Sequence, residues 1–264
     1  MTRRTPGWVL AVAGGVYLLL HLPVLVLVLF SFNASKYSVA WTGFTLEWYR
    51  RLGERTDLLR GLRASLIVGT ISTLVATVFG TLLALALARR RFPGRRALEG
   101  LLYLPIVTPE IVAGISLLAL FVLLRVPLGL ATITVAHIAF SVAFVAVVVR
   151  ARLEGMDGSL EEAAMILGAD ELTAFRTVTV PQLWPGIVAG ALLAFTMSFD
   201  DYVITSLVAG PGSSTLPVVV YGMVRRNVEP TVNAISTLIL LGTSLLIWLA
   251  TRLTRERPLS AARG

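Results

Sequence analysis

The sequence contains no cysteine, which excludes disulfide bonds, thiolate nucleophiles and cysteine-ligated metals. Charged residues are also scarce: they make up 14% of the 264 residues, against about 25% in ordinary soluble domains. Only two histidines occur, His21 and His137, and each lies alone in an apolar run. Because a metal site needs several convergent ligands, we interpret both as helix-packing residues and expect neither a metal nor a cofactor.

Catalytic patterns are missing as well. The chain has no G-x-x-x-x-G-K-[ST] phosphate loop, no H-E-x-x-H zinc motif and no Ser/His/Asp arrangement. The sequence therefore contains no motif that indicates a catalytic activity in this chain. We predict that the protein is not an enzyme.

Hydrophobic residues dominate, at 56% of the chain with a mean hydropathy of +0.82. The net charge is +8, and all but one of the 23 basic residues are arginines. In a soluble protein such a charge would suggest nucleic acid as a partner. Here most arginines flank apolar runs, so we interpret them as determinants of membrane orientation and expect membrane lipid, not nucleic acid, as a partner.

Six apolar runs are long enough to cross a bilayer, which needs about 20 residues per helix. They are Trp8–Phe32, Leu62–Ala88, Gly100–Leu124, Leu128–Val149, Gly186–Val208 and Val232–Leu249. The first is longer than the apolar part of a signal peptide, about 7–15 residues, and no clear cleavage site follows it. The sequence thus predicts an all-α, polytopic bundle of six transmembrane helices.

An even number of spans places both termini on one side, and the distribution of arginine selects the side. Of the 23 basic residues, 14 lie on one predicted side of the membrane: in the two termini, in the loop RRRFPGRR and in the segment around Arg150–Arg176. We therefore expect both termini in the cytoplasm. We predict a single transmembrane domain over 1–264, comprising a first helix with an external loop (1–60) and a core (61–252).

The stretch SLEEAAMILGADELTAFRTVTVP, Ser159 to Pro181, is charged and helix-forming although it lies between apolar runs. Ser159 followed by Glu162 predicts a capping box, Gly168 a left-handed helix end, and Asp170 the cap of a second short helix. We expect Pro181 and Pro185 to close the segment before the next span. The pattern alone also fits an amphipathic connector lying on the membrane.

Within this stretch, EAAMILGADELTAFRTVTVP closely resembles the EAA motif of ABC-importer permease subunits. The motif reads E-A-A, three residues, Gly, nine residues and I-x-L-P, and valines here replace its Ile and Leu. The resemblance implies that segment 156–181 is a cytoplasmic coupling helix that docks on an ATPase. The residues we assign to ATPase coupling are Glu161, Glu162, Ala163, Ala164, Gly168 and Glu171.

The resemblance extends over essentially the whole chain, because LYLPIVTPEIVAGISLLALF and SFDDYVITSLVAGPGSSTLPVVVYGMV look like the second permease subunit of spermidine/putrescine-type importers. It implies the type I importer permease fold, a cytoplasmic ABC ATPase dimer, a second homologous permease subunit and a periplasmic or lipid-anchored solute-binding protein as partners. The implied cargo is a polyamine. Related permeases carry ferric iron, thiamine, sulfate or phosphonates, and these remain alternatives.

Acidic residues inside apolar runs indicate a water-filled route or a partner. Asp200 and Asp201 lie in the fifth run, and Glu110 lies in the third. Adjacent helical residues point about 100° apart, so one aspartate is expected to line the route while the other caps backbone or meets a partner. In polyamine permeases, residues matching this set are associated with uptake: Trp48, Glu110, Glu171, Ser198, Asp200 and Asp201. The alternatives are a helix end at the interface for the aspartates and an arginine partner for Glu110.

Three other classes compete. An ion-coupled secondary transporter normally shows two homologous halves, and no internal repeat is visible. An intramembrane aspartyl protease needs aspartates on two spans, whereas Asp200 and Asp201 are neighbours. A structural scaffold would need no coupling segment.

Overall fold

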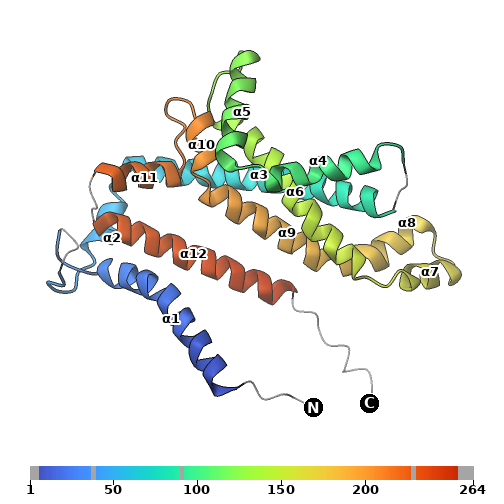
Figure 1. The fold of residues 1–264 in the computed structure, drawn as a ribbon, viewed down its shortest axis with the longest axis horizontal. Helices are drawn as coiled ribbons and strands as arrows, with labels where there is room; N and C mark the ends of the chain where they lie inside the picture. The colour runs from blue at the N-terminus through green and yellow to red at the C-terminus, as the bar shows by residue number, and fades with distance from the viewer. Residues whose placement is uncertain (1–5, 37–39, 90–91, 227–229, 255–264) are drawn as a thin grey trace. The chain divides into compact units, whose positions relative to one another are not determined.

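The computed structural model describes residues 6–36, 40–89, 92–226 and 230–254 (Figure 1). Within these ranges the regular structure is helical, apart from one isolated bridge between Asn33 and Phe44. The chain divides into two compact units: 1–59 with 220–244, and 60–219 with 245–264. The single transmembrane domain over 1–264, with a core that begins at residue 61, stays a prediction.

The first unit begins with helix α1 (Gly7–Phe30), which is exposed along its whole apolar window. An apolar helix without a buried face is stable where lipid is its solvent. The loop after it is folded around Asn33, whose side chain donates to the carbonyl of Ala40 (2.7 Å) and accepts the amide of Thr42 (2.9 Å). The same loop carries a short helix, α2 (Glu47–Leu52).

The second unit holds all or part of the following helices. They are α3 (Thr56–Arg89), α4 (Arg95–Val107), α5 (Glu110–Leu123), α6 (Leu130–Glu154), α7 (Ser159–Ile166), α8 (Glu171–Ala174), the π-helical turn η1 (Phe175–Thr179), α9 (Val180–Asp200), α10 (Val203–Val208) and the start of α11 (Leu216–Arg226). Two long helices, α3 and α12 (Pro230–Thr254), have residues in both units.

The core of the second unit forms where α3 and α9 both pack on α6, at Val145. A Cβ added at Gly80 of α3 would lie 2.7 Å from the Val145 Cβ, and one at Gly190 of α9 would lie 3.4 Å from its Cα. Small residues let helix backbones approach closely, which is the main packing device in membranes. Figure 1 shows α6 and α9 running alongside each other.

The expected spans are confirmed in outline, with two corrections. Five described helices are long and apolar enough to cross a membrane, or six if one bent pair is counted as a single span. That pair, α4 and α5, replaces the expected continuous run Gly100–Leu124 and bends by 110°. The bend falls at Thr108 and Pro109, both in extended conformation, because the residue before a proline avoids helical angles.

The fifth span also differs from its prediction. Pro181 and Pro185 do not close the preceding segment, since helix runs without interruption from Glu171 to Asp200. The wide π turn η1 ends at Thr179, two positions before Pro181. A wide turn of this kind can accommodate the amide donor that a proline lacks. The predicted C-terminal end of this span, Val208, is wrong as well. The helix ends at Asp200, and the separate helix α10 follows.

Candidate functional site

A cavity of about 450 Å³ lies in the second unit, beside one broken span and the break between two further helices. One break is Thr108–Pro109, between α4 and α5, and the other is Asp201–Tyr202, between α9 and α10. Both breaks contribute to the cavity wall. Within a bilayer, irregular backbone is tolerated only where it is buried in protein or lines a water-filled space.

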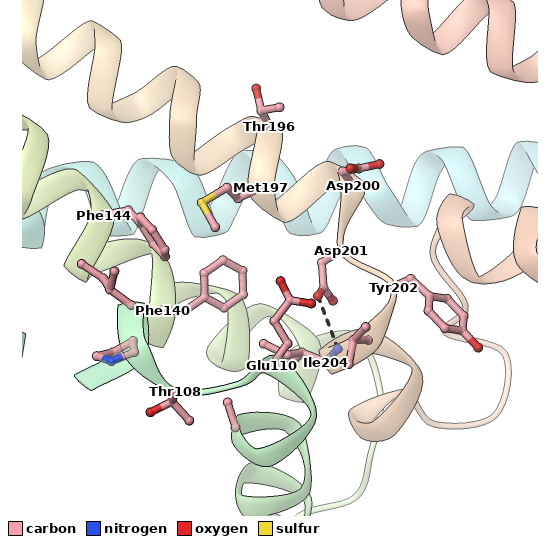
Figure 2. A pocket seen from close by; sticks show the side chains of 14 residues that line it. Thr108, Glu110, Phe140, Phe144, Thr196, Met197, Asp200, Asp201, Tyr202 and Ile204 are labelled. Carbon is pink, nitrogen blue, oxygen red and sulfur yellow. Dashed lines mark hydrogen bonds between the residues drawn. The ribbon is translucent and has the colours of Figure 1, made fainter. Parts of the chain in front are cut away.

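The cavity wall brings together three of the acidic residues expected in a substrate pathway: Glu110, Asp200 and Asp201. Figure 2 shows Glu110 extending from α5 in the direction of Asp201, while Asp200 projects from the end of α9. Among the described residues that line the cavity there is no lysine or arginine, and three rings are present: Phe140, Phe144 and Tyr202. The space is thus acidic and aromatic, which suits a cation.

The two aspartates differ in their partners. Asp201 accepts the amide hydrogens of Ile204 (3.3 Å) and Thr205 (2.7 Å) and the hydroxyl hydrogen of Thr205 (2.7 Å). Its carboxylate therefore caps the start of α10, as the dashed line to Ile204 in Figure 2 indicates. Asp200 is exposed at the end of α9. Asp201 therefore caps backbone, as expected for one of the two aspartates, whereas the assignment of the other to a substrate route stays a prediction.

Two further residues expected in the pathway lie elsewhere. Ser198 is 3% exposed and does not line the cavity; its hydroxyl bonds to Ser72 (3.0 Å) and to the ring of His137 (2.7 Å). Trp48 belongs to the first unit, where its indole donates to the carbonyl of Asn33 at 2.7 Å. The small cavity beside Trp48 is lined by Lys36, Arg51 and Arg55 among others, and is therefore basic. Their assignment to a substrate pathway stays a prediction.

The coupling segment forms a turn with exposed apolar residues at its tip. Gly168 has a φ of +98°, the left-handed conformation predicted for it. Its amide donates to Met165 and the next amide, of Ala169, donates to Ala164, which is the Schellman arrangement of a helix end. Directly before it, Ile166 and Leu167 are 86% and 88% exposed.

The ends of the short helices follow only part of the prediction. Asp170 caps α8 by accepting the amide of Thr173 at 3.0 Å, as expected. The prediction of a capping box at Ser159 is wrong. Helix α7 begins at Ser159, and the amide of this residue donates to the Asp157 carboxylate at 3.0 Å. Asp157 satisfies a free amide at the helix start, so the hydroxyl of Ser159 is not needed there.

The six residues assigned to coupling do not face one way. Glu162, Ala163, Gly168 and Glu171 are exposed, and Ala164 is half-buried. Glu161 instead points inward: it accepts Arg89 of α3 (Nη1 to Oε1, 2.9 Å) and the hydroxyl of Thr179 (2.7 Å).

Arg89 beside Glu161 holds the pKa of that carboxyl below its ordinary value, with Thr179 contributing. A carboxyl with a lowered pKa stabilises the fold fully above its unfolded-state pKa, about 4.3. That contribution is lost as the pH falls through the lowered value. The ion pair is therefore fully formed near neutral pH and ties α7 to the end of α3.

We expect Glu161→Gln to increase amide hydrogen exchange in α7 at pH 7 by about two- to fivefold, because partly exposed ion pairs contribute about 0.2–1 kcal/mol. Glu162→Gln is the matched control, since Glu162 has no ion-pair partner among the described residues. Equal exchange rates in the two variants would show that the Arg89 bond does not hold α7.

Several of these contacts were not anticipated from the sequence. Arg89 and Thr179 hold Glu161, and His137 with Thr205 lies directly behind Asp201. A lone histidine in an apolar run is a signal of a functional polar residue in a membrane helix. The sequence indicates only a packing role for His137, because its polar partners come from helices far away in the sequence.

Helices broken within apolar spans around an acidic cavity are typical of membrane transport proteins rather than of enzymes or scaffolds. Comparison with family profiles narrows this class. Residues 76–256 match the inner membrane component of binding-protein-dependent transport systems. The chain belongs to this family, and it is accordingly a permease subunit of an ABC importer and a multi-pass inner-membrane protein, not an enzyme.

Curated relatives cover most of the chain. It is 42% identical over 238 residues to the spermidine/putrescine transport system permease protein PotC of Escherichia coli (strain K12), covering 90% of each chain. It is also 42% identical to the putrescine transport system permease protein PotI of the same strain, covering 84% of this chain and 81% of that one. Identity to the PotC protein of Haemophilus influenzae is 37%, covering 91% and 94%.

Solved structures share the fold. A chain of a bacterial ABC transporter involved in the import of the acidic polysaccharide alginate superposes with a TM-score of 0.72 at 15% identity, covering 94% of both chains. A chain of the MetNI methionine ABC transporter in an inward-facing conformation gives a TM-score of 0.62 at 18% identity, covering 80% and 98%. The expected ABC type I importer permease fold is confirmed.

Proposed function

We propose that the chain forms half of a transmembrane pathway for polyamines such as spermidine and putrescine. The observation that supports this is the cavity between the two helix breaks, with Glu110, Asp200 and Asp201 in its wall and no basic residue among its described lining. A polyamine is a flexible chain of ammonium groups, each of which is attracted by carboxylates and by aromatic faces. The names of the PotC and PotI relatives fit the same cargo.

The charge of the cavity also ranks the alternative cargoes. Sulfate and phosphonate would be repelled by three carboxylates. For ferric iron, the described residues contain no group of three metal-ligating side chains. Thiamine is an aromatic cation, and the cavity carboxylates would attract it as they attract a polyamine. The uptake experiment must therefore distinguish thiamine from polyamines as the cargo.

The partners we propose are a second homologous permease subunit, which completes the pathway, a cytoplasmic ABC ATPase dimer and a solute-binding protein outside. Both termini lie in the cytoplasm in this arrangement. The exposed tip of the coupling segment, at Ile166 and Leu167, docks into the ATPase. Three residues are exposed around this tip: Glu162, Ala163 and Glu171. Gly168 forms the turn, and the half-buried Ala164 supports it. Glu161 anchors the segment through its ion pair with Arg89.

The continuous helix Glu171–Asp200 supports a mechanical route between the two sites. Its first residues follow the coupling segment, and its last residue lines the cavity. At 1.5 Å per residue, these 30 residues span about 45 Å. Movement of the ATPase dimer would thus be delivered along one rigid element to the carboxylates, in a two-state rocking motion. Ser198 lies on this helix, and Trp48 holds the external loop that meets the binding protein.

The test is uptake by the complete importer, reconstituted in proteoliposomes with its ATPase, partner permease and binding protein. We expect ATP-dependent accumulation of radiolabelled spermidine and putrescine, unaffected by excess thiamine, sulfate or phosphonate. A non-hydrolysable ATP analogue inside the vesicles is the control and should abolish uptake. Accumulation of thiamine in place of polyamine, or uptake that needs an ion gradient and no ATP, would contradict the proposal.

A further inference from the structure

A buried hydrogen-bonded chain runs behind the cavity wall and ends on one of its carboxylates. It links Ser72 of α3, Ser198 of α9, His137 of α6, Thr205 of α10 and Asp201. The successive distances are 3.0 Å, 2.7 Å, 3.0 Å and 2.7 Å, and the Nε2 atom of His137 also lies 3.3 Å from Oδ2 of Asp201. His137 is 0% exposed, so its two ring nitrogens depend on these partners for their hydrogen bonds.

The protein partners fix which ring nitrogen carries the proton. The hydroxyl hydrogen of Thr205 is committed to the Asp201 carboxylate, which can only accept. The oxygen of Thr205 therefore accepts from His137, and Nε2 must carry a hydrogen. Nδ1 then accepts the hydroxyl hydrogen of Ser198. The donors of Ser198, His137 and Thr205 thus point toward the carboxylate, while the hydroxyl of Ser72 also donates to the carbonyl of Gly69 at 3.3 Å. Such an ordered chain is stronger than its separate bonds.

We propose that His137 is a positioning residue for the pathway. Its Nε2–H holds the hydroxyl of Thr205 and the carboxylate of Asp201 in place at the cavity wall, while its Nδ1 accepts from Ser198. Asp201 is then a fixed carboxylate whose direction depends on where α3, α6, α9 and α10 stand relative to one another. Asp200, without these bonds, stays free to meet the cargo.

This arrangement makes the carboxylate sensitive to helix movement. Hydrogen bonds of about 2.7–3.0 Å weaken steeply once the atoms separate further. Helix shifts of about 1–2 Å are common in switching proteins, and a shift of that size in any of the four helices would break the chain. The link to transport rests on the proposed function, whereas the proton position on His137 does not.

The direct test is nitrogen-15 NMR of the full chain in nanodiscs, with labelled histidine. The sequence has two histidines, so His21→Gln leaves His137 as the single signal. We expect a protonated Nε2 and an unprotonated Nδ1 at neutral pH. Thr205→Val and Asp201→Asn should each shift the Nε2 resonance, and Ser198→Ala should shift Nδ1. Thr134→Ala, a half-buried position on the same helix whose hydroxyl bonds its own backbone, is the control and should shift neither.

A proton on Nδ1, or ring resonances that do not respond to Thr205→Val, would overturn the inference. Uptake by the reconstituted importer gives a second readout. His137→Leu should lower the uptake rate at least tenfold, and His137→Gln, whose amide can donate in place of Nε2, should restore most of it. Equal loss in both variants would mean that bulk and not the hydrogen bond matters. If the NMR result holds but no polyamine is imported, the proposed cargo is wrong and the role of His137 stands.

Discussion

Replacing Gly168 with valine is expected to leave the protein in the membrane and to abolish ATP hydrolysis stimulated by cargo-loaded binding protein. Gly168 lies outside the candidate spans, so insertion does not depend on it. Its φ of +98° is accessible to glycine but costs other residues about 1–2 kcal/mol, and a β-branched residue more. The substitution therefore distorts the turn that presents Ile166 and Leu167.

The reason for a large effect is geometrical. A coupling surface must hold its apolar side chains in one arrangement to fit a partner groove, and an error of about 1 Å at a site can cost about a hundredfold in activity. Stimulated ATPase activity and uptake should both fall to the background level. Gly168→Asn is the matched control, because asparagine tolerates the left-handed conformation, and it should retain most of the coupling. Normal coupling in the valine variant would count against docking through this turn.

The second large effect is expected from Asp200→Asn, which should lower the uptake of spermidine by roughly tenfold or more. At about 4 Å, a carboxylate attracts an ammonium group by about 1 kcal/mol in water and about 4 kcal/mol near a protein surface. Each 1.36 kcal/mol corresponds to a factor of about ten in rate. Asp200 has no capping role among the described contacts, so the loss should appear in transport and not in stability.

Asp201→Asn should behave differently, because Asp201 accepts two amide hydrogens and a hydroxyl at the start of α10. Loss of a cap costs about 0.5–2 kcal/mol, so this variant should show a lower melting temperature as well as lower uptake. Glu54→Gln removes an exposed carboxylate that is not among the residues lining the cavity, and it is the control. Uptake unchanged in Asp200→Asn would favour the alternative in which the aspartates only mark a helix end.

The sequence was sufficient to predict the class of fold and the approximate spans. Long apolar runs determine membrane helices because lipid leaves the backbone no other hydrogen-bond partners. The left-handed Gly168 and the cap at Asp170 were also predictable, since each depends on local chemistry. The cavity carboxylates were identified because charge inside an apolar run is costly and needs a reason.

The breaks in the spans were not predicted. Pro109 lies in the third apolar run, yet hydropathy averaged over a window shows the same value for a straight helix and for one bent by 110°. Pro181 was interpreted as a terminator, but the π turn before it lets the helix continue. The bend at Pro109 and the continuous helix through Pro181 both depend on which groups satisfy the backbone hydrogen bonds near the proline. Those groups cannot be identified from the hydropathy of one segment.

The network behind the cavity depends on contacts between residues far apart in the chain. Ser72 and Ser198 are 126 residues apart, and His137 and Thr205 are 68 apart. Each is an ordinary polar residue of an apolar helix when considered alone. Only the packing of α3, α6, α9 and α10 turns them into one hydrogen-bonded chain, so sequence patterns had no means of indicating it.

The most direct measurement is the access of a thiol reagent to the cavity during the ATP cycle. The chain has no cysteine, so Thr196→Cys places its single thiol in the cavity wall. In the reconstituted importer, labelling by a membrane-impermeant maleimide added outside should speed up when the ATPase is trapped with ATP and vanadate. With Gly168→Val present, labelling should no longer respond to the trapped nucleotide. A response that survives this substitution, or no response in the unaltered importer, would contradict the claim that the coupling segment transmits ATP-driven movement to the acidic cavity.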